Sequence, residues 1–414
     1  MRLAALALLS IWLALPAAAQ TVDANSRTEI TSARASNANR YVTICLVPDI
    51  QNMTSQSDFD AIGGATSCPV TAGLCTGSSC TQSPWCSGSW RNTGEILLRN
   101  MAYSLTGQWT SIDYRAIDGT DTVRSQKPHP LDHGPCDVIV GLGDNLDTAN
   151  GLAFGSLTAN QLHQYAMAKT FWTLIRDSGI PFIIARGNHE GEGTFEQLLA
   201  DLGVSGLSFY HDGDADGEQY AITFSTRIGT DFCLLTLDDD VAGTPGDQYT
   251  AGEAAWVLAT TGCGSDLPTL LIGHEIVNLD ASATLSAEAS TVVGTASADE
   301  VFLVAGGHYT ATPVISRKVE GTNVGGKAVF RLFSNWQEFN RHNQNVGGTG
   351  VSASDGIGGA YTVVTLDANS SRLCAHDWNP YFQTRSSKGG TQDNGGTEMF
   401  SSACFDFNFD ARYP

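Results

Sequence analysis

The sequence has few basic residues relative to acidic ones and, after its first twenty residues, no long apolar run. It contains 22 Lys and Arg against 43 Asp and Glu, which gives a formal net charge of −21. A field of that sign disfavours nucleic acid polymers and anionic membranes as partners. An anionic substrate would need cations close to it. The absence of a later membrane-length apolar run argues against a spanning helix in the mature chain.

Three signatures of catalysis or metal binding are also missing. The chain has no Gly-x-Ser-x-Gly, so a serine hydrolase of that type lacks its nucleophile motif. The sequence following His274 is not the His-Glu-x-x-His of zinc proteases, because Asn278 stands where the second His is needed. No pair among the ten cysteines has the Cys-x-x-Cys spacing of a zinc knuckle.

The N-terminus is apolar in the manner of an export signal. Arg2 precedes an apolar run that is too short to cross a bilayer, and the small residues Ala17 to Ala19 fit a cleavage site. We expect residues 1–19 to be a signal peptide and the protein to be secreted or periplasmic. Residues 20–40 are polar and without periodicity, which predicts a flexible lead.

All ten cysteines follow this predicted signal, and an even number in an exported chain predicts disulfides. The cysteines from Cys68 to Cys86 are expected to form disulfides within one irregular segment, in a pairing that the sequence leaves open. Cys374 and Cys404 could pin the C-terminal tail. Cys45 lies in an apolar, strand-like run, which favours a plain buried thiol.

Short apolar runs alternate with helix-like segments, as expected of strands buried on both faces in an α/β layered fold. Thr158 and Gln161 form a capping-box pattern that predicts the start of a helix. We expect one domain over residues 41–385 with a Cys-rich insertion at 54–92, and a tail at 386–414 packed on it. The apolar runs and the residues that follow them are 41–51, 137–144, 181–190, 232–240, 268–275 and 300–309.

Five of these runs end on side chains that bind metals or carry protons. Because the carboxyl ends of strands line the ligand crevice in open α/β sheets, these endings are expected to converge. Packing so many polar groups together would be costly without a counter-charge, whereas divalent metal ions would stabilise them. The sequence therefore predicts a dinuclear metal site. The endings carry Asp49 and Gln51, Asp144 and Asp147, Asn188 and His189, His274, and His308.

The order and spelling of these endings resemble the calcineurin-like metallophosphoesterases. That family has Asp-x-His, Gly-Asp-x-x-Asp, Gly-Asn-His-(Asp/Glu), a single His and Gly-His-x-His, and the resemblance covers residues from about 41 to 312. Further on, residues 333–337 and 355–367 are similar to a bacterial exported branch of the family that carries Asp-x-Gln first, as here. The resemblance implies a layered β-sandwich flanked by helices, with a disulfide-stapled insertion.

The resemblance also implies a role for each residue of the endings. Asp144 would bridge two divalent metal ions, drawn from Mn, Zn, Fe, Mg and Ca. The first ion would also bind Asp49 and Gln51. The expected ligands of the second ion are Asn188, His274 and His308.

Other residues would handle the substrate. His189 is expected to be the general acid, oriented by Asp147. Asn188 is expected to contact the substrate as well as the metal. Arg186 could contact a substrate phosphate through its planar fork, or form a salt bridge to Glu190.

Two departures from the family pattern fall on the first metal. Gln51 stands where the family has His, and Thr310 occupies the position of the second His in Gly-His-x-His. Oxygen ligands favour Mn, Mg or Ca over Zn or Fe. The first ion is therefore expected to bind weakly, to gain a ligand such as His376, or to be absent. Glu275 is expected to lie behind the ligands or to face solvent.

The sequence thus predicts an exported metal-dependent phosphoesterase that hydrolyses phosphate mono- or diesters of small molecules or nucleotides. The alternative is an extracellular binding protein that kept the metal and the fold but has weakened catalysis, suggested by Gln51 and Thr310. Retention of Asp147 and His189, which a binding module would not need, favours the enzyme. The loops at 54–92 and 338–358 are expected to set the choice between mono- and diesters.

Overall fold

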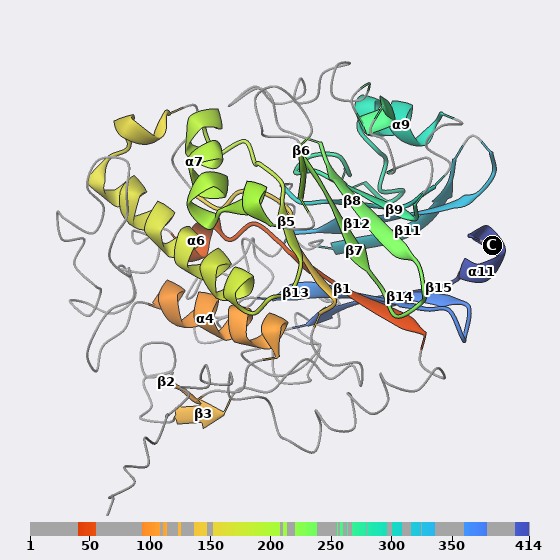
Figure 1. The fold of residues 1–414 in the computed structure, drawn as a ribbon, viewed down its shortest axis with the longest axis horizontal. Helices are drawn as coiled ribbons and strands as arrows, with labels where there is room; N and C mark the ends of the chain where they lie inside the picture. The colour runs from red at the N-terminus through yellow and green to blue at the C-terminus, as the bar shows by residue number, and fades with distance from the viewer. Residues whose placement is uncertain are drawn as a thin grey trace, which may run out of the picture.

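Two mixed β-sheets form the framework of the protein in the computed structural model (Figure 1). The predicted signal peptide, the rest of the lead before Arg40, the Cys-rich insertion, Asp147 and Thr310 lie outside the described residues. The structure describes residues 40–54, 93–107, 111–113, 123–125, 136–146, 152–207, 210–212, 220–237, 255, 257–259, 263, 267–278, 280–295, 300–308, 316–323, 325–335, 360–378 and 402–413.

The first sheet has six strands in the order β15-β14-β13-β1-β4-β5. Strands β1, β4 and β5 lie side by side and run parallel, so their carboxyl ends meet at one edge. Strands β13, β14 and β15 extend the sheet from β1 as antiparallel neighbours. Its strands are β1 (Tyr41–Val47), β4 (Val138–Gly141), β5 (Phe182–Ile184), β13 (Tyr361–Asp367), β14 (Arg372–Trp378) and β15 (Ser402–Asp406).

The second sheet has seven strands in the order β11-β12-β10-β9-β8-β7-β6. Its four central strands, β12, β10, β9 and β8, are parallel, and the outer ones are antiparallel. Strands β2 (Ser111–Asp113) and β3 (Val123–Ser125) form a separate pair. The strands of the second sheet are β6 (Tyr210–Asp212), β7 (Tyr220–Ser225), β8 (Asp231–Thr236), β9 (Thr269–Ile272), β10 (Val301–Gly306), β11 (Ser316–Thr322) and β12 (Ala328–Ser334).

Helices cover the sheets on their outer sides. In Figure 1, α4 and α6 lie side by side next to the first sheet, and α9 lies beside the second. The capping box predicted at Thr158 and Gln161 is present at the start of α6. The helices are α2 (Gln51–Thr54), α4 (Thr93–Thr106), α6 (Ala159–Asp177), α7 (Glu192–Leu202), α9 (Ala287–Val293) and α11 (Phe409–Arg412), with 3₁₀ turns η1 (Phe154–Ser156) and η2 (Val204–Gly206).

Successive side chains on each strand of the second sheet point to opposite faces, and each face packs against an apolar layer. On β8, Phe232 and Leu234 pack into a cluster shared with the first sheet and with helices α4 and α6. Their neighbours Cys233 and Leu235 point to the opposite face, where α9 contributes Val292 and other residues. The α/β class expected from the sequence is therefore confirmed, with two mixed sheets packed against each other.

Three disulfides join described cysteines: Cys45–Cys136, Cys233–Cys263 and Cys374–Cys404. The prediction that Cys45 is a plain buried thiol is wrong. Its partner lies 91 positions away and is brought close because β4 pairs alongside β1. These bonds indicate an oxidising, extracellular environment. Among the helices that the structure describes, none is long and apolar enough to span a membrane.

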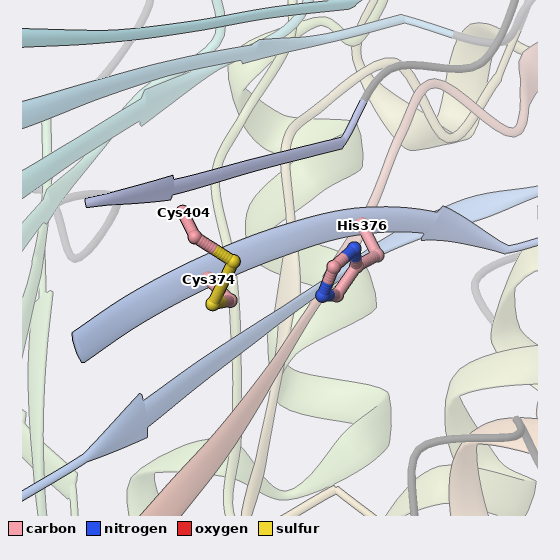
Figure 2. Close-up of side chains that lie close together, drawn as sticks. All are labelled: Cys374, His376 and Cys404. Atoms are coloured by element: carbon pink, nitrogen blue, oxygen red, sulfur yellow. A yellow bond between two sulfur atoms is a disulfide. The ribbon is translucent and has the colours of Figure 1, made fainter. Parts of the chain in front are cut away.

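The C-terminal part of the chain is joined to the first sheet. Cys374 and Cys404 are direct neighbours across β14 and β15, so their disulfide links the edge strand to the sheet, as Figure 2 shows. The buried side chains of Phe407 and Phe409 join the shared cluster. The Tyr413 hydroxyl donates to a backbone carbonyl just before β10, at 2.8 Å.

A buried polar network connects the two sheets near β11 and β12. Lys318 Nζ contacts both carboxylate oxygens of Asp377, at 3.0 and 2.8 Å. The Thr362 hydroxyl donates to Asp377 at 2.6 Å, and it lies 2.7 Å from the hydroxyl of Ser334. Lys318 and Ser334 belong to the second sheet, whereas Thr362 and Asp377 belong to the first. The network therefore holds the sheets in one relative position.

This network yields a stability prediction. Replacing Asp377 by Ala leaves the buried Lys318 ammonium without its carboxylate and should lower the free energy of unfolding by about 3–5 kcal/mol. Urea denaturation measures the loss. Asp177→Ala is the matched control, because Asp177 pairs with Arg176 on the surface, and its variant should unfold at the wild-type midpoint. Equal stability of the two variants would contradict the prediction.

Candidate metal centre

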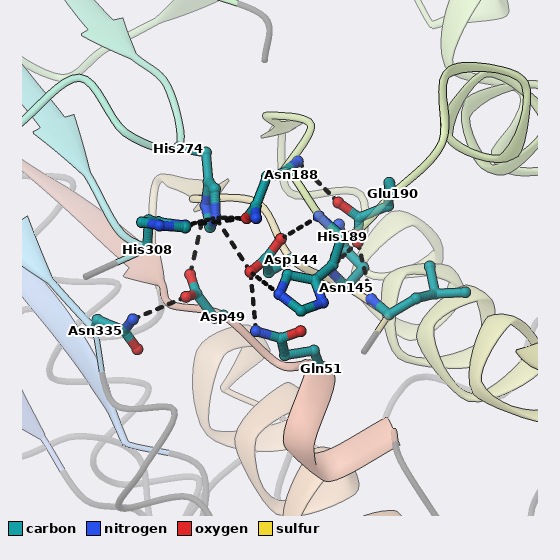
Figure 3. Close-up of polar contacts among 12 residues, drawn as sticks. Asp49, Gln51, Asp144, Asn145, Asn188, His189, Glu190, His274, His308 and Asn335 are labelled. Carbon is teal, nitrogen blue, oxygen red and sulfur yellow. Dashed lines mark hydrogen bonds and ion pairs between the residues drawn. The ribbon is translucent and has the colours of Figure 1, made fainter. Parts of the chain in front are cut away.

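The carboxyl ends of strands from both sheets meet at one place (Figure 3). Asp49, Asp144 and Asn188 follow β1, β4 and β5 of the first sheet. His274 and His308 follow β9 and β10 of the second sheet. Direct contacts between these side chains link all five into one cluster, as the strand endings in the sequence predicted.

The backbone around Asp144 is shaped for close approach. Asp144 has a φ of 48° and His308 a φ of 71°, a left-handed conformation that is rare for residues other than glycine and is often found at functional sites. Gly143, with a φ of 99°, lies against the His274 ring, where an added Cβ would come within 2.5 Å of Nδ1. A Cβ on Gly187 would overlap the Asp144 carboxylate. Two strand-end glycines thus let the ligand side chains approach one another.

Four side-chain atoms face one another at distances typical of ligands around an ion. His274 Nε2 lies 3.1 Å from Asp144 Oδ2 and 3.2 Å from Asn188 Oδ1. His308 Nδ1 lies 3.0 Å from Asn188 Oδ1 and 3.1 Å from His274 Nε2. Bond lengths of about 2.0–2.2 Å to a central ion give edges near these values. Asp144, His274 and His308 form a group that could hold a metal.

The hydrogen-bond partners of the two imidazoles indicate that these four atoms all present lone pairs. Nδ1 of His274 lies 2.7 Å from the Leu142 carbonyl, which can only accept, so this nitrogen carries the hydrogen and Nε2 does not. Nε2 of His308 contacts the Glu275 carboxylate, an arrangement that orients metal-binding imidazoles and leaves Nδ1 as the ligand atom. Lone pairs that face one another repel unless a cation lies between them.

A second position adjoins Asp144 on the side of Asp49 and Gln51. Gln51 Nε2 donates to Asp144 Oδ2 at 2.9 Å, and Asp49 Oδ1 lies 3.7 Å from His274 Nδ1. Among the described residues, Gln51 Oε1 and Asp49 Oδ1 are buried and make no hydrogen bond of ordinary geometry. Buried acceptors without donors are rare in proteins, and a cation would satisfy both.

The carboxylates of the cluster are strongly perturbed. Burial raises the pKa of Asp49 well above its usual range, because the attraction of His274 only partly opposes it. Burial also acts to raise the pKa of Asp144, but without a cation in the cluster the attraction and hydrogen bond of a protonated His274, with weaker attraction to His189 and His308, lower it overall. Asp144 is therefore the carboxylate best maintained as an anion by this chain alone.

Glu190 holds two of the strand-end loops together. It is buried, and its carboxylate accepts hydrogen bonds from the backbone N–H groups of Asn145 and Leu146 in one loop. Its other oxygen accepts from Gly187 N in the next loop, at 2.8 Å. Burial, with repulsion from Asp144, raises the pKa of Glu190 to about 7. This residue fixes the spacing between the loops of Asp144 and Asn188.

The residues expected to handle substrate are placed as follows. His189 lies at the rim of the cluster with its side chain 27 % exposed, and its Nε2 is 4.0 Å from Asp144 Oδ2. Its backbone N donates to Asp144 Oδ1 at 3.0 Å. Arg186 is 3 % exposed. Its expected contact with a substrate phosphate stays a prediction. Asp147 lies outside the described residues.

One expectation about a neighbouring residue is wrong, and another is decided between its two alternatives. His376 was a candidate for an extra ligand, but it lies on β14 beside the Cys374–Cys404 disulfide, two strands away from β1 (Figure 2). Glu275 does not face solvent, because it is 5 % exposed and contacts His308.

Sequence reasoning missed Asn335, which follows β12 and donates to Asp49 Oδ2 at 2.9 Å. The similarity of the segment around it to the exported branch marked the region but gave this residue no role. Sequence reasoning also missed Asn145. Its Oδ1 accepts a hydrogen bond from the Trp172 indole at 2.7 Å, and this bond joins the Asp144 loop to α6.

The role of Glu190 is testable by Glu190→Gln. The amide keeps the shape but directs an N–H group at backbone donors, so the free energy of unfolding should fall by about 1–3 kcal/mol. Affinity of the metal-stripped protein for Mn²⁺, measured by calorimetry, should fall as well. Glu192→Gln, on the exposed first turn of α7, is the control and should match wild type in metal affinity. If Glu190→Gln matches wild type in both stability and Mn²⁺ affinity, Glu190 does not support the site.

Comparison with known proteins returned no relative. No family model matches the chain, and no curated protein matches it. A fold alone does not determine a function, so the function has to be argued from the chemistry of the site. That chemistry is a cluster of metal-binding side chains with one partly exposed histidine at its rim.

Proposed function

We propose that the protein is an exported, metal-dependent phosphoesterase of the calcineurin-like type, acting on phosphate mono- or diesters of small molecules or nucleotides. One observation carries the proposal: lone pairs of Asp144, Asn188, His274 and His308 face one another at the ends of strands from two sheets. The order of the motifs along the chain supports the same assignment.

The residues present fit a pair of divalent cations. Asp144, Asn188, His274 and His308 would hold one of them, and Asp49 and Gln51, with Asp144 between, would hold the other. Bound cations of this kind supply Lewis acidity, which stabilises charge on phosphoryl oxygens and lowers the pKa of water. A chain with a net charge of −21 would otherwise repel a phosphorylated substrate, so the cations also account for its binding.

The chain's own groups supply the remaining steps. His189, at the exposed rim, is the proposed general acid that gives a proton to the leaving-group oxygen. Asp147 is proposed to orient that imidazole. The backbone hydrogen bond from His189 N to Asp144 Oδ1 couples the position of the acid to that of the metal ligands. Asn188, in the same loop, is proposed to bind both a cation and the substrate.

A second candidate is a metal-containing binding protein with weakened catalysis. The observation that favours it is the amide of Gln51 beside Asp144, where the resembled family has an imidazole. A binding protein would not need His189 at the rim, so the enzyme is the better supported function.

Metal removal separates the two functions. Treatment with a chelator should abolish hydrolysis of p-nitrophenyl phosphate and bis-p-nitrophenyl phosphate, because the protein's side chains alone cannot offset the phosphate charge. Addition of Mn²⁺, Zn²⁺, Fe²⁺, Mg²⁺ or Ca²⁺ should restore turnover of at least one ester, followed by absorbance. If no ion restores turnover of either ester, the binding protein is the correct reading.

The role of His189 is tested with His189→Ala. We expect metal content to stay at the wild-type level and turnover to fall by about a hundredfold or more for esters with poor leaving groups. Activated p-nitrophenyl esters should suffer less, since their leaving group needs no proton. His376→Ala, on β14 beside the disulfide, is a matched control that should keep full activity. Equal rates for both variants on the poor leaving groups would exclude His189 as the acid.

A further inference from the structure

The two sides of the metal centre differ in chemistry. On one side, two imidazoles and an amide oxygen face Asp144. On the other side, the groups placed against the carboxylates are amides: Gln51 Nε2 is 2.9 Å from Asp144 Oδ2, and Asn335 Nδ2 is 2.9 Å from Asp49 Oδ2. Both amides are buried, with 1 % and 2 % of their surface exposed.

Each of these amides can present its oxygen in place of its nitrogen. The two ends of a carboxamide have nearly the same size, and a half-turn about the terminal bond exchanges them. A carboxylate and an amide oxygen at such a separation would repel each other unless a cation bound both. Around an ion with bonds of about 2.1 Å in octahedral geometry, neighbouring ligand oxygens lie about 3.0 Å apart, which matches the spacing of both pairs.

The oxygens without donors point to the same conclusion. Gln51 Oε1 is buried and makes no hydrogen bond to any described residue, and buried Asp49 Oδ1 makes none of ordinary geometry, although the His308 backbone N–H contacts the Asp49 carboxyl group. Three buried carboxyl groups, those of Asp49, Asp144 and Glu190, lie in this region. Two amide donors bring no positive charge to these buried carboxyl groups, whereas a divalent cation does.

Asn335 is held firmly enough to be a ligand. It directly follows Ser334, the last residue of β12, whose hydroxyl lies 2.7 Å from that of Thr362 in the other sheet. Thr362 in turn donates to Asp377, which binds Lys318. The polar network between the sheets therefore fixes the backbone next to Asn335, as preorganised metal sites require.

We propose that the cation position between Asp49 and Asp144 is an all-oxygen site, completed by the side-chain oxygens of Gln51 and Asn335. Such a site selects hard cations, Mg²⁺, Mn²⁺ or Ca²⁺, while the position with two imidazoles takes Zn²⁺ or Fe²⁺. The centre is then a mixed pair with one hard and one softer ion. This inference rests on the proposed metal centre but does not require that the protein hydrolyse any ester.

Spectroscopy on the wild-type chain tests the donor set. Metal-stripped protein is given one equivalent of Zn²⁺ and then Mn²⁺, and the zinc content is checked by elemental analysis. Pulsed electron paramagnetic resonance of the bound Mn²⁺ should show no coupling to imidazole nitrogen. Imidazole coupling in protein that retains its zinc, or failure to bind Mn²⁺ beside zinc, would overturn the proposal.

Two substitutions at one position separate a ligand from an orienting donor. Asn335→Ala should weaken Mn²⁺ binding at the zinc-loaded centre by about tenfold to a hundredfold, the range seen when groups supporting a metal are lost. Asn335→Asp replaces the amide nitrogen by oxygen, so a ligand role predicts Mn²⁺ and Ca²⁺ affinity equal to or above wild type. Asn369→Ala, in an exposed turn, is the control and should bind as wild type does. Calorimetry measures all four proteins, and circular dichroism confirms that each is folded.

The outcomes are distinct from those that test the function. If Asn335→Asp weakens binding as much as Asn335→Ala does, Asn335 only donates to Asp49 and the all-oxygen site is wrong, even if ester hydrolysis is found. If Mn²⁺ binds as proposed but no ester is hydrolysed under any metal combination, the site stands and the phosphoesterase function falls.

Discussion

The structure depends on one electrostatic constraint: several lone pairs, from chain segments far apart in sequence, are directed at the same small volume. Asp144 lies at the centre, with its Oδ2 3.1 Å from His274 Nε2, which in turn lies 3.2 Å from Asn188 Oδ1. Such a concentration of acceptors is unfavourable without a cation. The left-handed backbone of Asp144 and His308 and the close glycine contacts are the local cost of bringing these groups together.

The strand endings were predictable from sequence, whereas the partners that depend on tertiary contacts were not. An apolar run followed by Asp, Asn or His marks both a strand and a ligand, so the convergence of Asp49, Asp144 and His274 followed from the rule that strand ends line a crevice. The start of α6 followed from its capping box, because that signal is local. Local patterns therefore gave the main elements and most of the candidate ligands.

Contacts between segments that are far apart in sequence left no local trace. The Cys45–Cys136 bond depends on β4 lying next to β1, and an apolar run around a cysteine reads the same whether or not a partner is near. Asn335 reaches Asp49 from 286 positions away, and nothing in its neighbours assigns it to the centre. The prediction that His376 could be a ligand failed for the same reason. The position of a histidine late in the chain depends on the strand order, which the sequence does not show.

The origin of the ligands in two different sheets has a consequence for how the protein acquires its ions. Neither sheet alone supplies a complete set, because β1, β4 and β5 carry Asp49, Asp144 and Asn188, while β9 and β10 carry the histidines. An ion that binds only the docked sandwich stabilises that state by mass action. In the proposed metal centre, cation binding would thus be thermodynamically linked to the joining of the sheets, with the cation acting as a clasp between the two halves.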